Sequence, residues 1–517
     1  MKTNRKTIFT GAFALVFAGI TGKVISASYR IPLQNLTGDI GFYIYQQVYP
    51  VIGIAIMMAL YGLPSAVAAF LMEHQLENGN RKITLAIFKM LFLLGVFFFA
   101  LLFLFSPLLA EAMGDQQLAE PIRHMAWIFL FVPFVAIYRG RLQAVNHLSA
   151  VANSQMVEQI IRALIIIFTA VWIYRNNVSP YRIGDGAAIG TAAAFTASFL
   201  LLYFTWKKKY SNREEAHTEN ISSYHIFRTV IITGIIMSMN HMMLLFMQLA
   251  DAFTIVPGLV TGGWTQLEAM KWKGIIDRGQ PLLQLVTIIG SSLAMALVPQ
   301  ISGNKEESIR NIRTALKYGI LISVGATAGL IVLMPDINEL FYQNTDGTFS
   351  LRMLSITLLF SASSLILAAI LQGFGYTRGT AIVLFAALWL KVLLNQLLVP
   401  FLDIDGAAIA TILSIGFVCV LYYYMLTKKI VKFNVRILPV IQTGLATVVM
   451  IAGLLLVKYV EMNYWEIETR AEQLIFVLFS VLAGFILYLF SLIRLRIFSQ
   501  AELAKIPVIR KWSKEES

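Results

Sequence analysis

Four cationic side chains lie inside stretches of sequence that are otherwise apolar: Lys23, Arg30, Arg278 and Lys391. A charge at the centre of a lipid-facing helix costs something like 2.5–3.5 kcal/mol, so each should face protein or a water-filled cavity. Lys23 and Arg30 are seven residues apart, about two helical turns, and therefore share one face of a helix. A cavity lined by such groups is suited to binding an anion.

Lys391 and one further cation, Arg162, have the depth expected of a buried charge. Arg162 and Lys391 each lie about eleven residues into their apolar stretch, or roughly 16 Å along a helix. Glu158 precedes Arg162 by one turn, so these two side chains can neutralise each other. Lys391 has Asn395 on its own helix but no nearby acid in the sequence. Lys391 is therefore the stronger candidate for binding a ligand.

The positions of Arg278 and Arg30 can also be explained by structural roles that involve no ligand. Arg278 follows Asp277 directly, so a local ion pair or an anchor at the outer interface is possible, and Asp251 is an alternative partner. Arg30 can snorkel to the outer headgroups, as long basic side chains near helix ends do. Lys23 lies deeper and has less freedom to do so. The supporting candidates are thus Arg162, Glu158, Asp277, Asp251 and Asn395.

The sequence lacks the clustered groups that an enzyme needs. The histidines are scattered and show no metal-ligand spacing such as His-Glu-x-x-His, and no phosphate-binding Gly-x-x-x-x-Gly-Lys-Ser/Thr loop occurs. We expect no enzymatic activity, no cofactor and no metal site. Any transport would be passive or coupled to an ion.

The composition is that of a polytopic membrane protein. Of 517 residues, 58% are hydrophobic and 13% are charged, whereas soluble domains average roughly 45–50% and about 25%. A hydrocarbon core needs about 20 apolar residues per helical crossing. Fourteen such stretches predict an all-α protein with fourteen transmembrane helices. They begin near Ile8, Phe42, Ile83, Ile122, Val151, Asp185, Ile226, Gly279, Arg313, Leu351, Thr380, Gly406, Arg436 and Ala471.

The net charge of +13 follows from membrane topology, and we expect no nucleic-acid partner. Every second connection is basic, including one that holds Arg139 and Arg141, while the alternate connections, such as that at Asp39, are acidic or neutral. Basic connections lie in the cytoplasm. Both termini are therefore predicted to be cytoplasmic, with an even number of crossings.

An internal repeat divides the chain into two halves. Residues 142–143 (LQ) and 185–191 (DGAAIGT) return as residues 371–372 (LQ) and 405–411 (DGAAIAT). Counted from the first of these segments, Arg162 corresponds to Lys391. The small residues of the motif allow close approach of helices. Two parallel repeats predict two membrane lobes. The predicted divisions are an N-lobe at 1–206, a cytoplasmic linker at 207–224, a C-lobe at 225–430, an appended helix pair at 431–496 and a basic cytoplasmic tail at 497–517.

One outer connection, between Phe253 and Ile276, is long and contains Trp264 and Trp272. Its tryptophans and alternating polarity indicate an interfacial helix on the outer leaflet. A re-entrant cap over the outer mouth is the alternative.

The chain resembles the multidrug/oligosaccharidyl-lipid/polysaccharide flippase superfamily, in particular the polysaccharide-transporter branch that contains lipid II flippases and the stage V sporulation protein B group. Three segments carry the resemblance: residues 38–50, Gly62-Leu63-Pro64, and Asp277-Arg278 running to residues 297–302. It implies export of an undecaprenyl-diphosphate-linked sugar precursor by alternating access. The family's cavity arginines would correspond to Lys23 or Arg30 and to Arg278. One difference is that residues 42–72 contain no Lys or Arg, whereas the peptidoglycan flippase has a basic residue in its second span.

The residue chemistry agrees with this resemblance, because a diphosphate suits the bidentate geometry of Arg30 and Arg278. The function predicted is a flippase for a polyprenyl-linked anionic glycolipid in a bacterial cytoplasmic membrane, with membrane lipids as its other partners and a monomeric state. An inside-negative potential favours outward movement of negative charge. The alternatives are a cation-coupled multidrug exporter, which needs acids in its cavity, and a membrane-embedded cell-envelope polymerase, which needs a large catalytic outer loop.

Overall fold

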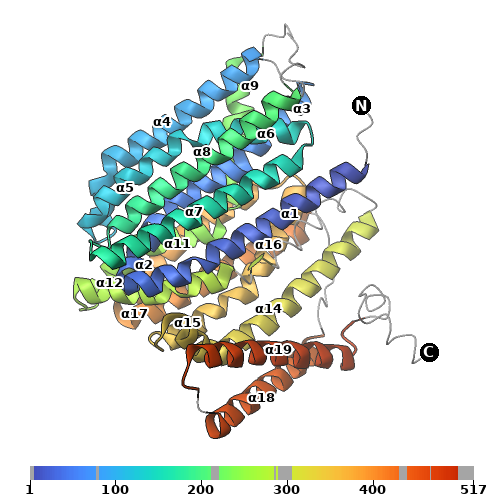
Figure 1. Cartoon of the computed structure of the whole chain (residues 1–517). Helices are drawn as coiled ribbons and strands as arrows, with labels where there is room; N and C mark the ends of the chain where they lie inside the picture. Colours follow the sequence, from blue (N-terminus) through green and yellow to red (C-terminus); the bar gives the residue numbers. More distant parts are fainter. Residues whose placement is uncertain are drawn as a thin grey trace.

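The computed structural model describes residues 5–76, 81–210, 221–284, 287–288, 305–429, 439–465 and 467–498. Within these ranges the chain is helical and contains no strand. Long helices lie side by side in one bundle (Figure 1). This agrees with the predicted all-α membrane fold, since eleven helices are long and apolar enough to cross a membrane.

The helices of the first half surround a core formed by α2, α3 and α6. The helix α7 packs against α1 and α8, and α3 packs against α6. The bounds are α1 Arg5–Ser28, α2 Arg30–Met57, η1 Met58–Gly62, α3 Leu63–Glu73, α4 Arg81–Ala112, η2 Gln116–Leu118, α5 Ala119–Ala126, η3 Trp127–Leu130, α6 Val132–Ala144, α7 Leu148–Asn176 and α8 Arg182–Tyr210.

In the second half, α17 packs against α11 and α16, and α14 packs against α16. The bounds are α9 Ser223–Ile226, η5 Phe227–Ile232, α10 Thr233–Asn240, α11 Met243–Thr261, α12 Gln266–Asp277, α14 Lys305–Tyr342, α15 Thr348–Ser355, α16 Thr357–Gly373 and α17 Thr377–Lys429. The pair α18 Val440–Tyr464 and α19 Arg470–Arg494 packs on α14 at one edge of the bundle (Figure 1).

Two helical runs contain a sharp break. The first is a candidate span of 60 residues, Ala14–Glu73, broken at Gly38 with φ 68°. The second has 52 residues, Thr377–Lys428, and is broken at Asp403 with φ 51°. Glycine adopts positive φ readily, whereas a non-glycine residue does so less often. Each run is longer than the roughly 20 residues of a single crossing.

The repeated motif sits where two helices approach closely in each half. A Cβ on Gly186 would lie 2.4 Å from Thr169 Oγ1, and a Cβ on Gly406 would lie 2.6 Å from the Leu398 carbonyl oxygen. Any larger residue at these two positions would force the helices apart. The predicted packing role of the motif is confirmed.

The predicted outer connection at residues 253–276 is much shorter in the structure. Phe253–Thr261 is the end of α11, and only residues 262–265 join it to α12. The helix α12 packs on α2 so tightly that a Cβ on Gly274 would lie 2.2 Å from the Asp39 carbonyl oxygen. The predicted start of the connection at Phe253 was wrong because the apolar pattern of α11 continues through Pro257, which the helix accommodates. The rest of the predicted connection contains a short helix, α12, as expected.

Arg139 and Arg141 also differ from expectation. The sequence placed them in a cytoplasmic connection, but both lie in α6 and are buried. The Arg141 guanidinium carbon lies 3.7 Å from the ring centroid of Trp206, a cation–π contact. The predicted linker is described only outside residues 211–220. The motif residues 297–302 and the tail beyond residue 498 lie outside the described ranges.

Candidate functional site

Arg30 is a fully buried cation that lies near the Tyr29 hydroxyl and packs on aromatic rings. Its guanidinium carbon lies 4.1 Å from the ring centroid of Tyr49 and 5.9 Å from that of Tyr45. Its exposed fraction is 0%, and none of its three guanidinium nitrogens has a hydrogen-bond partner among the described residues. An aromatic face attracts a cation but leaves its N–H groups unsatisfied. The side chain is therefore able to accept an anionic ligand.

The break at Gly38 explains how Arg30 reaches these rings. Tyr45 and Tyr49 are four residues apart on α2 and lie on the same helix face. The non-helical backbone of Gly38 redirects the chain, so that the first turns of α2 run back beside the later ones. The Tyr29 and Tyr45 hydroxyl groups are also in hydrogen-bond contact. A cation and an aromatic wall from one helix thus face each other.

Arg278 is buried as well, but all its hydrogen-bonding capacity is directed at protein groups. Its Nη2 lies 2.7 and 2.8 Å from the two carboxylate oxygens of Asp39, and its Nε lies 3.0 Å from Oδ1. Its Nη1 donates to the side-chain oxygens of Asn344 at 2.6 Å and Asn338 at 3.3 Å. This bidentate ion pair joins the first half of the chain to the second.

The partners that the sequence suggested for Arg278 are bound elsewhere. Asp277 forms an ion pair with Lys273, one turn earlier on α12, because residues four apart share a helix face and adjacent residues do not. Asp251 binds Lys391. Both suggested pairs were wrong, since Asp39 is 239 positions from Arg278 in the chain and only tertiary structure brings them together.

Two of the four predicted cations meet at the joint between α2 and α14. The Tyr342 hydroxyl donates to the Arg278 carbonyl at 3.0 Å and lies within electrostatic range of both Arg278 and Arg30. Asn35 fixes the joint: its Nδ2 donates to the Phe341 carbonyl at 2.7 Å, and its Oδ1 accepts from Gln343 at 2.7 Å. Arg30 and Arg278 therefore belong to one region between the two halves.

Lys391 lies in a separate cluster inside the second half. Its Nζ donates to Asp251 Oδ2 at 2.7 Å and to Thr411 Oγ1 at 2.6 Å. Asn395 donates to Asp251 Oδ1 at 2.9 Å and to Thr254 Oγ1 at 2.7 Å. Two of the supporting candidates, Asp251 and Asn395, thus surround Lys391. Its charge is neutralised by an acid from α11 that no local sequence pattern indicates.

The predicted pair of Arg162 and Glu158 is confirmed, with one addition that sequence reasoning missed. Glu158 also accepts from Arg139 at 2.8 Å. Arg139 further donates to the hydroxyl groups of Ser154 and Ser198, each at 3.1 Å. The apolar stretch that begins near Ile122 reaches Arg139 within about 20 residues, so a full-length crossing would have included it.

Lys23 lies apart from both clusters. It is half-buried on α1 and lies within electrostatic range of His241, whose ring stacks on Tyr61 with centroids 4.4 Å apart. Nearby, a Cβ on Gly22 would contact Gln159 of α7 at 3.1 Å. The structure therefore places Lys23 near α10 and η1 rather than beside Tyr342.

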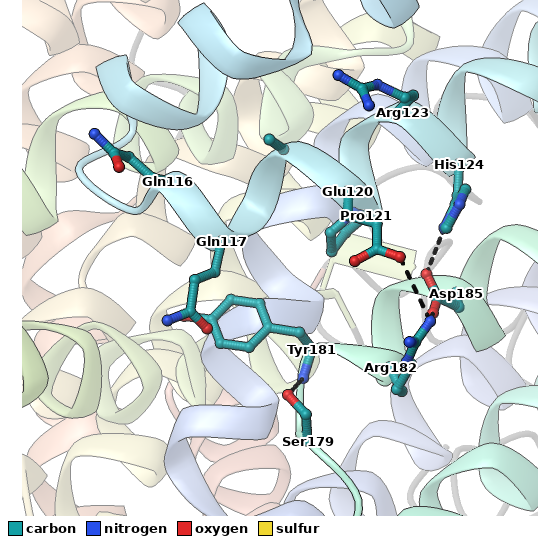
Figure 2. Close-up of a pocket in the computed structure, with 11 residues that line it drawn as sticks. Gln116, Gln117, Glu120, Pro121, Arg123, His124, Ser179, Tyr181, Arg182 and Asp185 are labelled. Carbon is teal, nitrogen blue, oxygen red and sulfur yellow. Dashed lines mark hydrogen bonds and ion pairs between the residues drawn. The ribbon is translucent and has the colours of Figure 1, made fainter.

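A polar hollow of about 710 Å³ lies between α5 and the start of α8. Figure 2 shows Glu120, Arg182, Asp185 and His124 pointing toward one another, while Arg123 points away from them. His124 Nδ1 lies 2.6 Å from Asp185, and Arg182 lies 2.9 Å from Asp185 and 3.5 Å from Glu120. In the repeat, Asp405 is hydrogen-bonded by Ser350. The first residue of each motif thus ties its helix to a neighbouring short helix.

Known proteins with a similar sequence or fold agree with this architecture. Residues 8–305 match the family described as polysaccharide biosynthesis protein. The uncharacterized membrane protein YabM of Bacillus subtilis is 36% identical and covers 99% of this chain and 97% of its own length. The lipid II flippase MurJ of Bacillus subtilis is 22% identical and covers 83% of this chain and 84% of its own length.

The fold is also that of a solved transporter. The structure of lipid II flippase MurJ in an inward closed conformation matches with a TM-score of 0.67 at 14% identity, covering 95% of this chain and 98% of that chain. The family match spans more than half of the sequence, and the YabM match spans nearly all of it. The chain therefore belongs to the polysaccharide biosynthesis protein family, within the multidrug/oligosaccharidyl-lipid/polysaccharide flippase superfamily.

Proposed function

We propose that this protein moves a polyprenyl-diphosphate-linked glycan precursor from the inner to the outer leaflet of a bacterial cytoplasmic membrane. The transport is proposed to proceed by alternating access between two lobes. Membership of the polysaccharide biosynthesis family supports a lipid-linked sugar as cargo. A relative named as a lipid II flippase supports movement across the bilayer.

The observation that carries the proposal is the state of Arg30. A buried charge without hydrogen-bond partners is costly, because burial removes water without replacing its hydrogen bonds. A diphosphate would supply several acceptor oxygens, and charge-assisted bonds between guanidinium and phosphate are strong. The buried nitrogens of Arg30 are therefore the first contact proposed for the headgroup.

Arg278 is proposed to act as a latch as well as a contact. In this conformation Asp39 occupies its bidentate face, and the pair joins the first half to the second. A phosphate arriving at Arg30 would compete with Asp39 for Arg278 across Tyr342. Loss of the Asp39 contact would then release one half from the other. Lys391 is ion-paired with Asp251 in this conformation, so the proposal gives it no direct headgroup contact.

The proposed topology has fourteen crossings in two lobes of six and an appended pair. Division of the two long runs at Gly38 and Asp403 into two crossings each raises the eleven candidate spans to thirteen. The fourteenth proposed crossing, which begins near Gly279, lies largely outside the described residues. The start of α1 and the end of α19 lie at the same end of the bundle (Figure 1), as an even number requires. We propose that this end is cytoplasmic, that residues 1–206 and 225–430 form the lobes, and that the protein works as a monomer.

A cation-coupled exporter of the same superfamily is the rival transporter. It needs a carboxylate that is able to bind and release a proton or sodium ion. Among the described residues, the buried acids Glu158, Asp251 and Asp277 and the partly buried Asp39 each form an ion pair with Lys or Arg. The buried Asp115 instead accepts hydrogen bonds from the hydroxyl groups of Tyr43 and Tyr181. The ion pairs at four of these five acids favour an anionic cargo over cation exchange, and Asp115 is the carboxylate that the rival would have to use.

The proposal is tested in cells depleted of their resident lipid II flippase. We expect wild-type protein to restore exposure of the precursor at the outer leaflet, and Arg30→Gln to abolish it. Arg141→Gln is the matched control, because Arg141 is also a buried arginine stacked on an aromatic ring but belongs to no proposed contact. This control should retain transport.

A binding measurement separates the cargo from the site. Purified protein in lipid nanodiscs is titrated with undecaprenyl diphosphate, which carries the phosphates without a glycan. Affinity should fall at least about tenfold in Arg30→Gln, the equivalent of 1.4 kcal/mol, and stay unchanged in Arg141→Gln. Equal affinities would remove Arg30 from the site. Absence of rescue together with intact binding would reject lipid II and direct attention to another glycan.

A further inference from the structure

The cluster around Lys391 has the composition of a binding site for a small cation. Asp251 supplies one carboxylate, and Thr411 and Thr254 supply hydroxyl oxygens close to it. Asn395 is fully buried, and among the described residues its side-chain oxygen Oδ1 has no hydrogen-bond partner, the Lys391 ammonium included. That amide is oriented by its neighbours, because Asp251 accepts from Nδ2 and so leaves the oxygen unused. Oxygen ligands of this kind suit hard cations.

The charges of the cluster fix the valence of that cation. Among the residues that the structure describes, Asp251 is the one carboxylate that forms an ion pair with Lys391, so one positive charge makes the pair neutral. The neighbouring Lys273 and Asp277 form their own ion pair and add no net charge. Among the described residues no group of three or more His, Cys, Asp or Glu side chains is placed to hold a metal. The balance therefore suits a monovalent cation rather than a divalent one.

We propose that the ammonium group of Lys391 is a tethered substitute for a bound monovalent cation. The side chain carries the positive charge to the carboxylate of Asp251 and the hydroxyl of Thr411. Asn395 holds that carboxylate from its other oxygen and is itself bonded to Thr254. The site is filled permanently, so this half of the protein keeps its structure without an ion from solution. The inference does not depend on the identity of the cargo.

The type of side chain supports this assignment. A lysine ammonium is a compact point charge with three donors, whereas an arginine guanidinium is a planar fork. A small ion can therefore replace the first but not the second. In the first half the equivalent position is Arg162, paired with Glu158, and that cluster should not acquire an ion site when its arginine is shortened.

The test is to remove the tether and offer a free ion in its place. Wild type, Lys391→Ala and Arg162→Ala are purified in detergent, and Tm is measured in sodium chloride and in N-methylglucamine chloride of equal ionic strength. Wild type should melt at the same temperature in both salts. Lys391→Ala should melt lower in N-methylglucamine and regain several degrees in sodium, saturably, because an ion that binds only the folded state stabilises it.

Two controls locate the effect. The double variant Lys391→Ala with Asp251→Asn lacks the carboxylate, so its Tm should be the same in sodium chloride and in N-methylglucamine chloride. Arg162→Ala should be destabilised equally in both salts. A sodium response in wild type, or none in Lys391→Ala, would overturn the proposal.

A second variant guards against failure to fold. Lys391→Gln leaves a smaller cavity and adds an amide oxygen to the site, so its Tm should also rise in sodium. Methylammonium should stabilise Lys391→Ala by restoring the missing ammonium. If neither variant folds in sodium, the proposal is equally refuted, because sodium is expected to supply the missing charge.

Discussion

The two halves of the chain neutralise their buried cations in different ways. In the first half, Glu158 alone serves two arginines, Arg139 and Arg162, so this cluster carries a net positive charge. In the second half, Lys391 and Asp251 form an ion pair of one cation with one anion, and that pair is neutral. The repeat places Arg162 and Lys391 at corresponding positions, so the difference arises from the residues around them.

The comparison shows that the fold repeats more closely than the chemistry does. In both halves the seventh motif residue, Thr191 or Thr411, donates to the carbonyl four residues earlier at 2.8 Å. Thr411 in addition accepts from Lys391 at 2.6 Å. One backbone geometry therefore supports an arginine cluster in one lobe and a lysine cluster in the other. The largest expected effects come from the carboxylates.

Glu158→Gln should be the most destabilising change, because it leaves two buried guanidinium groups without a counter-charge. Removing one partner of a buried pair typically costs about 3–5 kcal/mol, and we expect a loss at the upper end, about 5 kcal/mol. Reversible unfolding in mixed detergent micelles measures the loss. If Glu158→Gln loses less stability than Asp251→Asn, the net charge of a cluster does not determine how much its carboxylate stabilises the fold.

Asp251→Asn should cost about 3 kcal/mol, since one ammonium loses its carboxylate while Thr411 remains. The double variant Asp251→Asn with Lys391→Met removes both charges and should be more stable than Asp251→Asn alone, because neutral replacements of buried pairs are often tolerated. The same unfolding measurement forms a double-mutant cycle. Additive losses would mean that the two side chains do not interact energetically.

The two motif threonines offer a matched comparison at smaller scale. Thr411→Val removes a hydrogen bond to a charged group and should cost about 1.5–3 kcal/mol, whereas Thr191→Val should cost about 1 kcal/mol or less. Both side chains are buried and both bond the helix backbone. Equal losses, measured as before, would contradict the assigned bond between Lys391 and Thr411.

The smallest difference is expected at the first motif residues. Ser350 is buried and bonds Asp405, so Ser350→Ala should cost about 1 kcal/mol. His124 is partly exposed, and Asp185 keeps Arg182 as a second partner, so His124→Ala should cost less. Thermal melting of the two variants side by side gives the order. A larger loss of stability in His124→Ala than in Ser350→Ala would contradict the expected order of the two contacts.

Local patterns in the sequence predicted the helical membrane fold, the repeat and the Glu158–Arg162 pair. Each depends on short-range periodicity or on residues one helical turn apart, which a linear sequence displays directly. The pairs of Asp39 with Arg278 and Asp251 with Lys391 span 239 and 140 positions. Such contacts depend on how helices are arranged, so the sequence led to wrong partners for Arg278 and to an apparently unpaired Lys391.

The sequence by itself determined that charges lie in the bilayer and that two similar halves contain them, because hydrophobic length and motif repetition are local properties. Only the tertiary structure decided which cation is neutralised by a carboxylate and which is packed on aromatic rings instead. The electrostatic energy of a buried charge depends on the groups that neighbouring helices place within a few ångströms of it. That neighbourhood leaves Arg30 without a hydrogen-bond partner among the described residues.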